Sequence, residues 1–327
     1  MVERVNQFDE IYRKSNGTSN KEKNENLKRD TQKVPLYLDI ELTNCCNITC
    51  NMCPVGTGKM KRSKGFMTDE VFDKICENVE KYSIEAVRFI RWGEPVLHKN
   101  FLFYLEKMKK TGALVHFNTN GMLLTEYMMK KIIDLQIESV KFSFQGIDHQ
   151  TYSEMRTGGN YEQLFSIIQN FYKFRGENKY PYISVTTSTT YETKKEIEKF
   201  KKSILPYCDK VGVGQTKMEH VDLEKMDILP ERKLLYETYI HKEQGIMKRL
   251  EVCPELWDKL SINWDGSVSA CCRDYDNQML IGNILEDDLL TLFHNKKEKM
   301  YRTIVCNGEQ DKLPLCKVCY EYIPVEK

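Results

Sequence analysis

The chain has 327 residues, 41% of them hydrophobic, and its 49 basic and 48 acidic residues leave a formal net charge of +1. This length and composition support a sizeable core and about two domains, while the balanced charge argues against a nucleic-acid partner held by bulk electrostatics. Because it has neither a secretory signal nor an apolar run of bilayer length, the sequence predicts a cytoplasmic protein with no membrane association.

The first 222 residues contain a polar segment and then a regular alternation of strands and helices. Residues 1–34 are rich in Lys, Asn and Glu and predict a flexible or peripheral extension. Between residues 35 and 222, strands are predicted at 37–42, 86–91, 114–118, 139–144, 182–187 and 210–213, and helices at 71–82, 101–110, 126–135, 161–174 and 194–203. The alternation predicts six βα units around a parallel sheet, with the chemistry in the loops that follow the strands.

The remaining third of the chain has a different pattern. Residues 223–250 are charged and predict a helical connection in which Pro230 opens a helix. Residues 251–327 predict a smaller domain, in which the turn Asp265-Gly266 joins two β-type runs into a hairpin and a helix covers 289–299. The six histidines show no paired spacing such as H-x3-H, so a structural role is expected for each.

The cysteines fall into two groups that indicate metal sites. Four of the twelve lie between residues 45 and 53 and six between 253 and 319, and without an export signal metal ligation is favoured over disulfides. Cys46, Cys50 and Cys53 stand in C-x3-C-x2-C spacing on one loop. Zinc sites and iron–sulfur cubes normally take four protein ligands, so three cysteines would leave one iron open for chemistry. A zinc knuckle or a fortuitous cluster is the alternative.

The second group predicts a complete four-thiolate site. The hairpin would bring Cys253 and Cys271 together, and Cys316 and Cys319 form a closing C-x2-C pair. Zinc and a 4Fe–4S cluster both fit this spacing. Cys272 is an alternative ligand to Cys271.

The three-cysteine loop resembles the cluster motif of the radical S-adenosylmethionine (radical SAM) enzymes. In that family the open iron of a 4Fe–4S cluster binds SAM, whose reductive cleavage gives a 5′-deoxyadenosyl radical that abstracts a hydrogen atom from the substrate. The resemblance implies an α/β fold with a partial (β/α)6 TIM-like barrel. It also implies a flavodoxin- or ferredoxin-type electron donor.

Three further motifs follow predicted strands and support this resemblance. Residues 92–95 (Trp-Gly-Glu-Pro) resemble the family's G-G-E-P motif with Trp in place of the first Gly, residues 143–146 resemble S-x-D-G with Gln in place of Asp, and residues 156–159 resemble R-x-G-G. The resemblance implies SAM contacts from Met52, Gly93, Glu94, Ser143 and Arg156.

The second cysteine group resembles the auxiliary-cluster extension called SPASM in its long form and twitch in its short form. No further cysteine follows Cys319, so the one-cluster, twitch-type form, a small hairpin-plus-helix domain, is the better match. It implies a second 4Fe–4S cluster. The gaps between the motifs are similar to those of the 2-deoxy-scyllo-inosamine dehydrogenases, which oxidise an aminocyclitol alcohol.

The leading hypothesis is therefore an oxidoreductase of the dehydrogenase type. It would act on a sugar-like or cyclitol alcohol, and the auxiliary cluster would accept the second electron. One alternative is a radical epimerase with a cysteine hydrogen donor, for which Cys208 and Cys272 are candidates. A peptide maturase is another, and a non-enzymatic iron–sulfur or zinc scaffold is the least favoured.

Overall fold

Six parallel strands form the centre of the computed structural model, which describes residues 3–16, 25, 28, 33–243, 247–249, 252–319 and 322–324. The strands lie side by side in the order β1 (Tyr37–Ile40), β3 (Ala86–Phe89), β4 (Leu114–Thr119), β5 (Ser139–Ser143), β7 (Tyr182–Thr189) and β8 (Lys210–Gln215). Each of the six predicted strands is present, and each pairs in parallel with the next.

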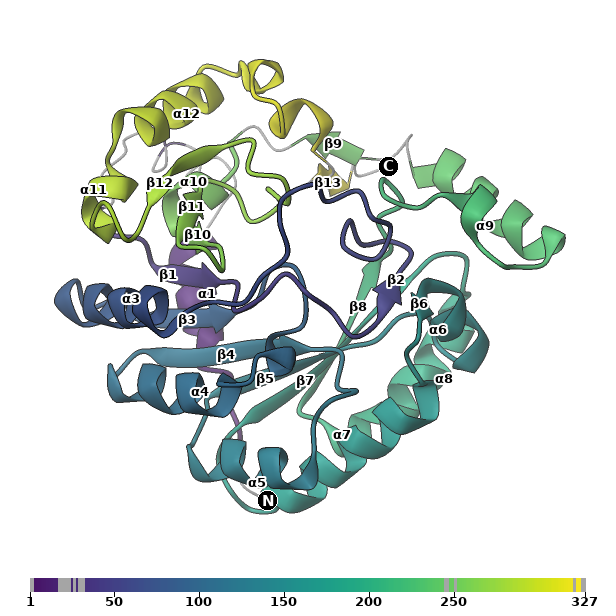
Figure 1. Cartoon of the computed structure of the whole chain (residues 1–327). Coiled ribbons are helices and arrows are strands. Elements are labelled where there is room, and N and C mark those ends of the chain that lie inside the picture. The colour runs from purple at the N-terminus through teal and green to yellow at the C-terminus, as the bar shows by residue number, and fades with distance from the viewer. Residues whose placement is uncertain are drawn as a thin grey trace.

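Five helices cover the outer face of these strands (Figure 1). They are α3 (Asp69–Lys81), α4 (Phe101–Lys110), α5 (Glu126–Asp134), α7 (Tyr161–Arg175) and α8 (Lys194–Ile204). Threonine caps fix several of their first turns: the side chain of Thr68 accepts a hydrogen bond from Val71 N, and Thr125 does the same for Met128 N. The five predicted helices are thus present, with ends that differ by one or two residues.

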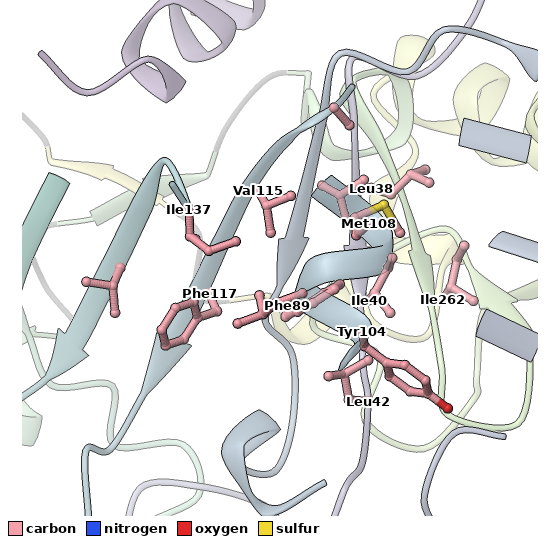
Figure 2. Close-up of a cluster of buried hydrophobic side chains, with 14 of the residues drawn as sticks. Leu38, Ile40, Leu42, Phe89, Tyr104, Met108, Val115, Phe117, Ile137 and Ile262 are labelled. Atoms are coloured by element: carbon pink, nitrogen blue, oxygen red, sulfur yellow. The ribbon is translucent and has the colours of Figure 1, made fainter. Parts of the chain in front are cut away.

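Alternation along each strand separates the core from the barrel interior. Val140 and Phe142 of β5 belong to the main hydrophobic core, whereas Lys141 and Ser143 point to the other face, which is the barrel interior. Figure 2 shows this core between the strands and α4, where Phe89 and Phe117 lie with Tyr104 and Met108.

The C-terminal hairpin extends the same sheet. β10 (Lys259–Ile262) pairs in parallel with β1, and β11 (Ser267–Ser269) and β12 (Leu280–Asn283) follow in antiparallel order. The result is an open nine-stranded sheet with β8 and β12 at its edges. α10 (Glu255–Asp258), α11 (Leu289–Phe293) and α12 (Lys296–Cys306) accompany this end of the sheet (Figure 1).

The single helix predicted over 289–299 is two helices, which corrects that prediction. α11 ends before His294, and the side chain of Asn295 then accepts a hydrogen bond from Glu298 N. Asn295 has extended backbone angles and caps α12, so the chain restarts rather than continues.

Shorter elements complete the described chain. They are β2 (Thr49–Cys50), α6 (His149–Met155), β6 (Arg156–Thr157), α9 (Pro230–Glu243), β9 (Met247–Arg249), β13 (Tyr322–Pro324) and the 3₁₀ turns Pro95–Leu97, Leu205–Tyr207, Leu223–Lys225, Gln310–Lys312 and Cys316–Val318. Among the described residues, no helix is both long enough and apolar enough to cross a bilayer.

The N-terminal helix α1 (Phe8–Asn16) packs at the amino ends of the strands. Phe8 and Ile11 are 1% and 2% exposed and pack with Tyr37 of β1 and Ala86 of β3. The polar composition of residues 1–34 suggested a flexible or peripheral extension, but this part of it is anchored to the barrel.

A buried chain of charges connects the hairpin to the barrel. Asp39 of β1 accepts hydrogen bonds from Arg88 of β3 at 2.6 and 2.8 Å and pairs with Lys259 of β10 at 2.9 Å. Lys259 also pairs with Glu255 at 2.7 Å. Although burial opposes its ionisation, Arg88 and Lys259 hold the pKa of Asp39 well below its ordinary value.

Candidate active site

The loop after β1 presents its three spaced cysteines beside β6. β2 and β6 form a short antiparallel ladder in which Cys50 is the partner of Arg156. The guanidinium of Arg156 lies 3.7 Å from Cys50 Sγ and donates to Phe144 O at 3.3 Å. On the other side, Asn120 Nδ2 lies 3.8 Å from Cys46 Sγ. Residues after three different strands therefore fix this loop.

Two glycines allow other segments to approach the cysteine loop closely. Gly93 has φ +84°, and a Cβ there would lie 2.3 Å from Thr43 O and 2.6 Å from Cys45 O. A Cβ at Gly56 would lie 2.4 Å from Cys50 O. Since neither position has room for a side chain, glycine sets the loop's conformation at both.

Glu94 is held by donors from the neighbouring strand end. It is 2% exposed; Oε1 accepts hydrogen bonds from Thr119 Oγ1 at 2.8 Å and Val96 N at 3.2 Å, and Oε2 accepts one from Asn120 N at 2.7 Å. Burial raises its pKa to about 7 despite these hydrogen bonds. A cation next to this carboxylate would favour the ionised form.

These residues line one cavity of about 280 Å³ at the carboxyl ends of the strands, which we call the upper cavity. All the predicted residues of the first site lie in its wall: Cys46, Cys50, Cys53, Met52, Gly93, Glu94, Ser143 and Arg156. The structure thus brings together residues that are as far as 110 positions apart in the sequence.

The cysteines of the upper cavity fit a bound cluster. Burial raises the pKa of Cys46 to about 11 and also raises those of Cys50 and Cys53, while Arg156 opposes the increase. Buried thiolates need a nearby positive charge, which iron would supply.

In the part of the chain that the structure describes, no three Cys, His, Asp or Glu side chains are arranged to hold one metal ion. Cys46, Cys50 and Cys53 instead share the wall of the upper cavity.

The second cysteine group lines a neighbouring cavity of about 290 Å³, the auxiliary cavity. Its wall contains all four predicted ligands, Cys253, Cys271, Cys316 and Cys319. Cys272 is half-buried and is not part of this wall, and its hydrogen bond with Cys271 and its desolvation raise its pKa well above the ordinary value. Cys271 therefore has the better placement of the two alternatives.

Polar residues that the sequence did not single out also line the auxiliary cavity. Glu219 accepts hydrogen bonds from Arg273 Nη2 at 2.7 Å and lies 2.7 Å from His220 Nε2. Although burial opposes ionisation, His220 and Arg273 hold the pKa of Glu219 below its ordinary value. Arg273 also donates to Cys319 Sγ at 3.0 Å. His220 follows β8 at a strand end, which was the signal available in the sequence.

The walls of the two cavities are in contact. Trp92 lines the upper cavity and Tyr275 the auxiliary cavity, and their rings meet edge to face at 5.9 Å. Arg91, which also lines the upper cavity, donates to Asp274 O at 3.0 Å. The two predicted cluster sites are therefore neighbours, with their walls joined at Trp92 and Tyr275.

Cys208 and Cys76 lie away from both cavities. Cys208 is 6% exposed, precedes β8 and donates to Ile204 O at 3.6 Å, so it sits in the core at the amino ends of the strands. Cys76 belongs to α3, and its side chain is buried in the core. Neither Cys208 nor Cys272 is among the described residues that line the upper and auxiliary cavities.

Comparisons with known proteins agree with this arrangement. The model of the radical SAM superfamily matches residues 40–204, and the model of the iron–sulfur cluster-binding domain SPASM matches residues 253–320. The tungsten-containing aldehyde ferredoxin oxidoreductase cofactor-modifying protein of Pyrococcus furiosus is 26% identical over 309 residues, which are 83% of this chain and 84% of that protein. The S-adenosyl-L-methionine-dependent 2-deoxy-scyllo-inosamine dehydrogenase of Niallia circulans is 22% identical over 290 residues, 86% of this chain and 91% of that protein.

Solved structures show the same fold. Streptococcus suis SuiB bound to its precursor peptide SuiA superposes with a TM-score of 0.62 at 16% identity, covering 85% of this chain and 69% of that one. The predicted partial (β/α)6 barrel is thereby confirmed. Since the first family model spans just over half of the chain, the protein belongs to the radical SAM superfamily, whose resident groups are a 4Fe–4S cluster and SAM, and its residues 253–320 match an auxiliary iron–sulfur cluster-binding domain.

Proposed function

We propose that the protein oxidises a secondary alcohol of a sugar-like or cyclitol substrate, with the auxiliary cluster as acceptor of the second electron. The observation that carries this proposal is the contact between the walls of the two cysteine-lined cavities, where the rings of Trp92 and Tyr275 meet. A substrate bound near this contact would lie between the two redox centres. A relative that is itself a 2-deoxy-scyllo-inosamine dehydrogenase supports the substrate class.

Each cavity would bind different cofactors. Cys46, Cys50 and Cys53 would hold the first cluster, while Cys253, Cys271, Cys316 and Cys319 would hold the second. Glu94 would attract the ammonium group of SAM, and Arg156 its carboxylate, for which a guanidinium offers two parallel donors. Met52, Gly93 and Ser143 would complete the contacts with SAM.

When bound, these groups would supply the redox chemistry, namely removal of one hydrogen atom from the substrate carbon and acceptance of the second electron. The chain must then accept the proton of the substrate hydroxyl so that a C=O bond can form.

His220 is the proposed proton acceptor. Its Nε2 lies 2.7 Å from Glu219 Oε1 and its ring meets Tyr275 edge to face at 5.1 Å, at the wall between the cavities. Arg273 fixes Glu219 with two hydrogen bonds. A base oriented by a carboxylate, itself held by a third group, is a recurrent catalytic arrangement. When Nε2–H donates to Glu219, Nδ1 carries the lone pair that accepts the proton.

The alternatives receive less support from this geometry. An epimerase needs a thiol that can reach the substrate, and among the described residues the only thiols in the cavity walls are those assigned to the two clusters. The likeness to SuiB concerns the fold alone. For division of the chain, we propose a core of residues 35–222, a connection at 223–250 and an auxiliary domain from 251, joined to the core through β1 and β10.

The test begins with anaerobic reconstitution of the full chain, with a flavodoxin, a ferredoxin or a chemical reductant as electron donor. We expect about eight irons per chain, four for each cluster, and formation of 5′-deoxyadenosine. With a cyclitol deuterated at the reacting carbon, deuterium should appear in 5′-deoxyadenosine. Solvent deuterium in recovered substrate would instead indicate epimerisation.

Two variants separate the steps. Cys316→Ala should retain SAM cleavage and lose the ketone product, whereas Cys306→Ala, on α12 outside the cavity wall, should retain both. His220→Gln should lower ketone formation more than 5′-deoxyadenosine formation, by about a hundredfold for loss of a general base. If a fully loaded enzyme cleaves SAM but oxidises no member of a panel of sugar and cyclitol alcohols, the proposed substrate class is wrong.

A further inference from the structure

A third polar cavity lies at the amino ends of the strands, on the opposite side of the barrel from the cysteine loop. It has a volume of about 190 Å³ and lies between the interior faces of β4, β5, β7 and β8 and the helix α1. We call it the lower cavity. At roughly 30 Å³ per water molecule it has room for several waters or for one small anion.

The half-buried side chain of Lys141 lines the lower cavity. Among the described residues, no hydrogen bond or ion pair to Lys141 is found, although a charge partly withdrawn from water normally has a partner. Burial, and secondarily Arg88, lower the pKa of Lys141 to about 8. The carboxylate of Asp39, which favours its charged form, is already bound by Arg88 and Lys259. The ammonium is therefore left facing the cavity.

Three hydroxyl groups surround Lys141 on neighbouring strands. Ser139 lies two residues before it on β5, Ser184 is its register partner on β7, and Thr186 is two residues further along β7. All three line the cavity, and their hydroxyls make no hydrogen bond within the described residues. A hydroxyl can donate to an anion at a cost no greater than to water.

The other titratable residues in the wall leave it with a net positive charge. Lys210 of β8 faces the cavity, and Asp9 of α1, whose Oδ1 accepts a hydrogen bond from Asn6 Nδ2 at 3.1 Å, is the one carboxylate among the lining residues. Burial lowers the pKa of His116 to about 3, so its imidazole is neutral. His116 Nε2 donates to Asn118 Oδ1 at 2.8 Å, and its buried Nδ1 is left as an acceptor without a partner.

We propose that the lower cavity is a binding site for a phosphate-sized oxyanion, held by the Lys141 ammonium and by the hydroxyls of Ser139, Ser184 and Thr186. The anion would supply the charge that Lys141 lacks. A protonated oxygen, as in monohydrogen phosphate, would also donate to His116 Nδ1. Since α1 forms one wall of the cavity, occupancy would fix the N-terminal helix against the barrel.

The test measures binding of inorganic phosphate to the reconstituted full chain by calorimetry, with saturating SAM so that the Arg156 cavity is occupied. Charge-assisted hydrogen bonds contribute about 1.5–3 kcal/mol, so Lys141→Met should weaken phosphate binding by about tenfold or more. Ser184→Ala should weaken it by a smaller factor. Lys130→Met is the control, because Lys130 lies on the surface and pairs with Glu126.

A second readout reports on α1. Phosphate should slow tryptic cleavage after Arg13 and Lys14 in the wild type and in Lys130→Met, but not in Lys141→Met. In phosphate-free buffer Lys141→Met should fold normally, since it removes a half-buried charge that has no partner among the described residues.

Methyl phosphate distinguishes the sources of the anion: equal binding indicates the phosphoryl group of a metabolite, and binding of inorganic phosphate alone indicates the free ion. The proposal is overturned if phosphate at about 10 mM, well above cellular substrate levels, does not bind the wild type. It is also overturned if Lys141→Met binds phosphate as tightly as the wild type does.

Discussion

Replacement of Arg62 by methionine should loosen the loop between the cysteines and α3. Arg62 forms a two-pronged contact with Glu41, one hydrogen bond of which is 2.7 Å, and also donates to Tyr275 O at 2.8 Å. The Glu41 side chain is fully buried and that of Arg62 is 8% exposed. Arg62 therefore ties the end of β1 to the wall between the two cavities.

The size of the effect follows from burial. Removing one partner of a buried ion pair costs about 3–5 kcal/mol, because the other charge remains buried. Arg91 Nε, 3.9 Å from Glu41 Oε2, keeps some compensation, so we expect about 3 kcal/mol. That corresponds to about a hundredfold increase in local opening.

Tryptic cleavage at Lys59, Lys61 and Lys64 under native conditions measures this opening. Arg62→Met should be cut about a hundredfold faster than the wild type, and the double variant Glu41→Gln/Arg62→Met should recover part of the difference. Lys130→Met is the matched control, because its pair with Glu126 is 55% and 62% exposed and contributes about 0–1 kcal/mol. The reasoning is refuted if Arg62→Met and Lys130→Met are cut at the same rate.

Three further predictions concern the site. Gly93→Ala should prevent assembly of the first cluster, because the new Cβ would overlap Thr43 O. Gly112→Ala is the control: its φ of +86° is similar, but its Cβ would lie in open space, so it should keep the wild-type iron content. Equal iron content in both variants would contradict this prediction. SAM affinity should fall by up to about tenfold for each pH unit below about 7, because burial raises the pKa of Glu94 to about 7 and the protonated carboxyl no longer attracts an ammonium group. Titration of SAM between pH 6 and 8.5 measures this dependence. Glu94→Gln should bind SAM weakly and without the pH dependence. Cys208→Ala should leave product formation unchanged in a turnover assay, because Cys208 lies in the core away from both cavities; loss of product with normal folding would restore a role for its thiol.

Local spacing, strand order and the resemblance to radical SAM motifs together predicted the residues that line the upper cavity. Each of its predicted residues lies in or after a strand-end loop, and parallel strands bring their carboxyl ends to one edge. Cys46 and Glu94 could therefore be placed together although 48 positions separate them. Placing residues at this edge requires only the order of the strands along the chain. The alternation of strand-like and helix-like segments in the sequence gives that order.

The proposed proton acceptor, His220, could not be predicted in the same way. Glu219 and His220 follow β8, whereas Arg273 and Tyr275 come from the loop after the hairpin, and no spacing links the two segments. The hairpin lies beside β1 only in the tertiary structure, and the pairing of Glu219 with Arg273 depends on that position. A histidine without a paired histidine looked structural for that reason.

The anchoring of α1 was not predicted because the polar residues that follow it in the sequence obscured its own apolar pattern. Phe8, Ile11 and Tyr12 stand at i, i+3 and i+4, which is the pattern of a helix with one apolar face. Averaged over the polar residues that follow, this short pattern disappears. The break between α11 and α12 likewise rested on one residue, the cap Asn295.

The position of β1 between β10 and β3 limits how such enzymes can be recombined. A shortened chain without the hairpin would leave the backbone N–H and C=O groups of β1 as an exposed edge, which is a template for aggregation, and would take Lys259 away from the buried Asp39. An auxiliary domain therefore cannot be exchanged between relatives as an independent cassette. A chimera would need β1 and β10 from the same parent, or a neutral residue in place of Asp39.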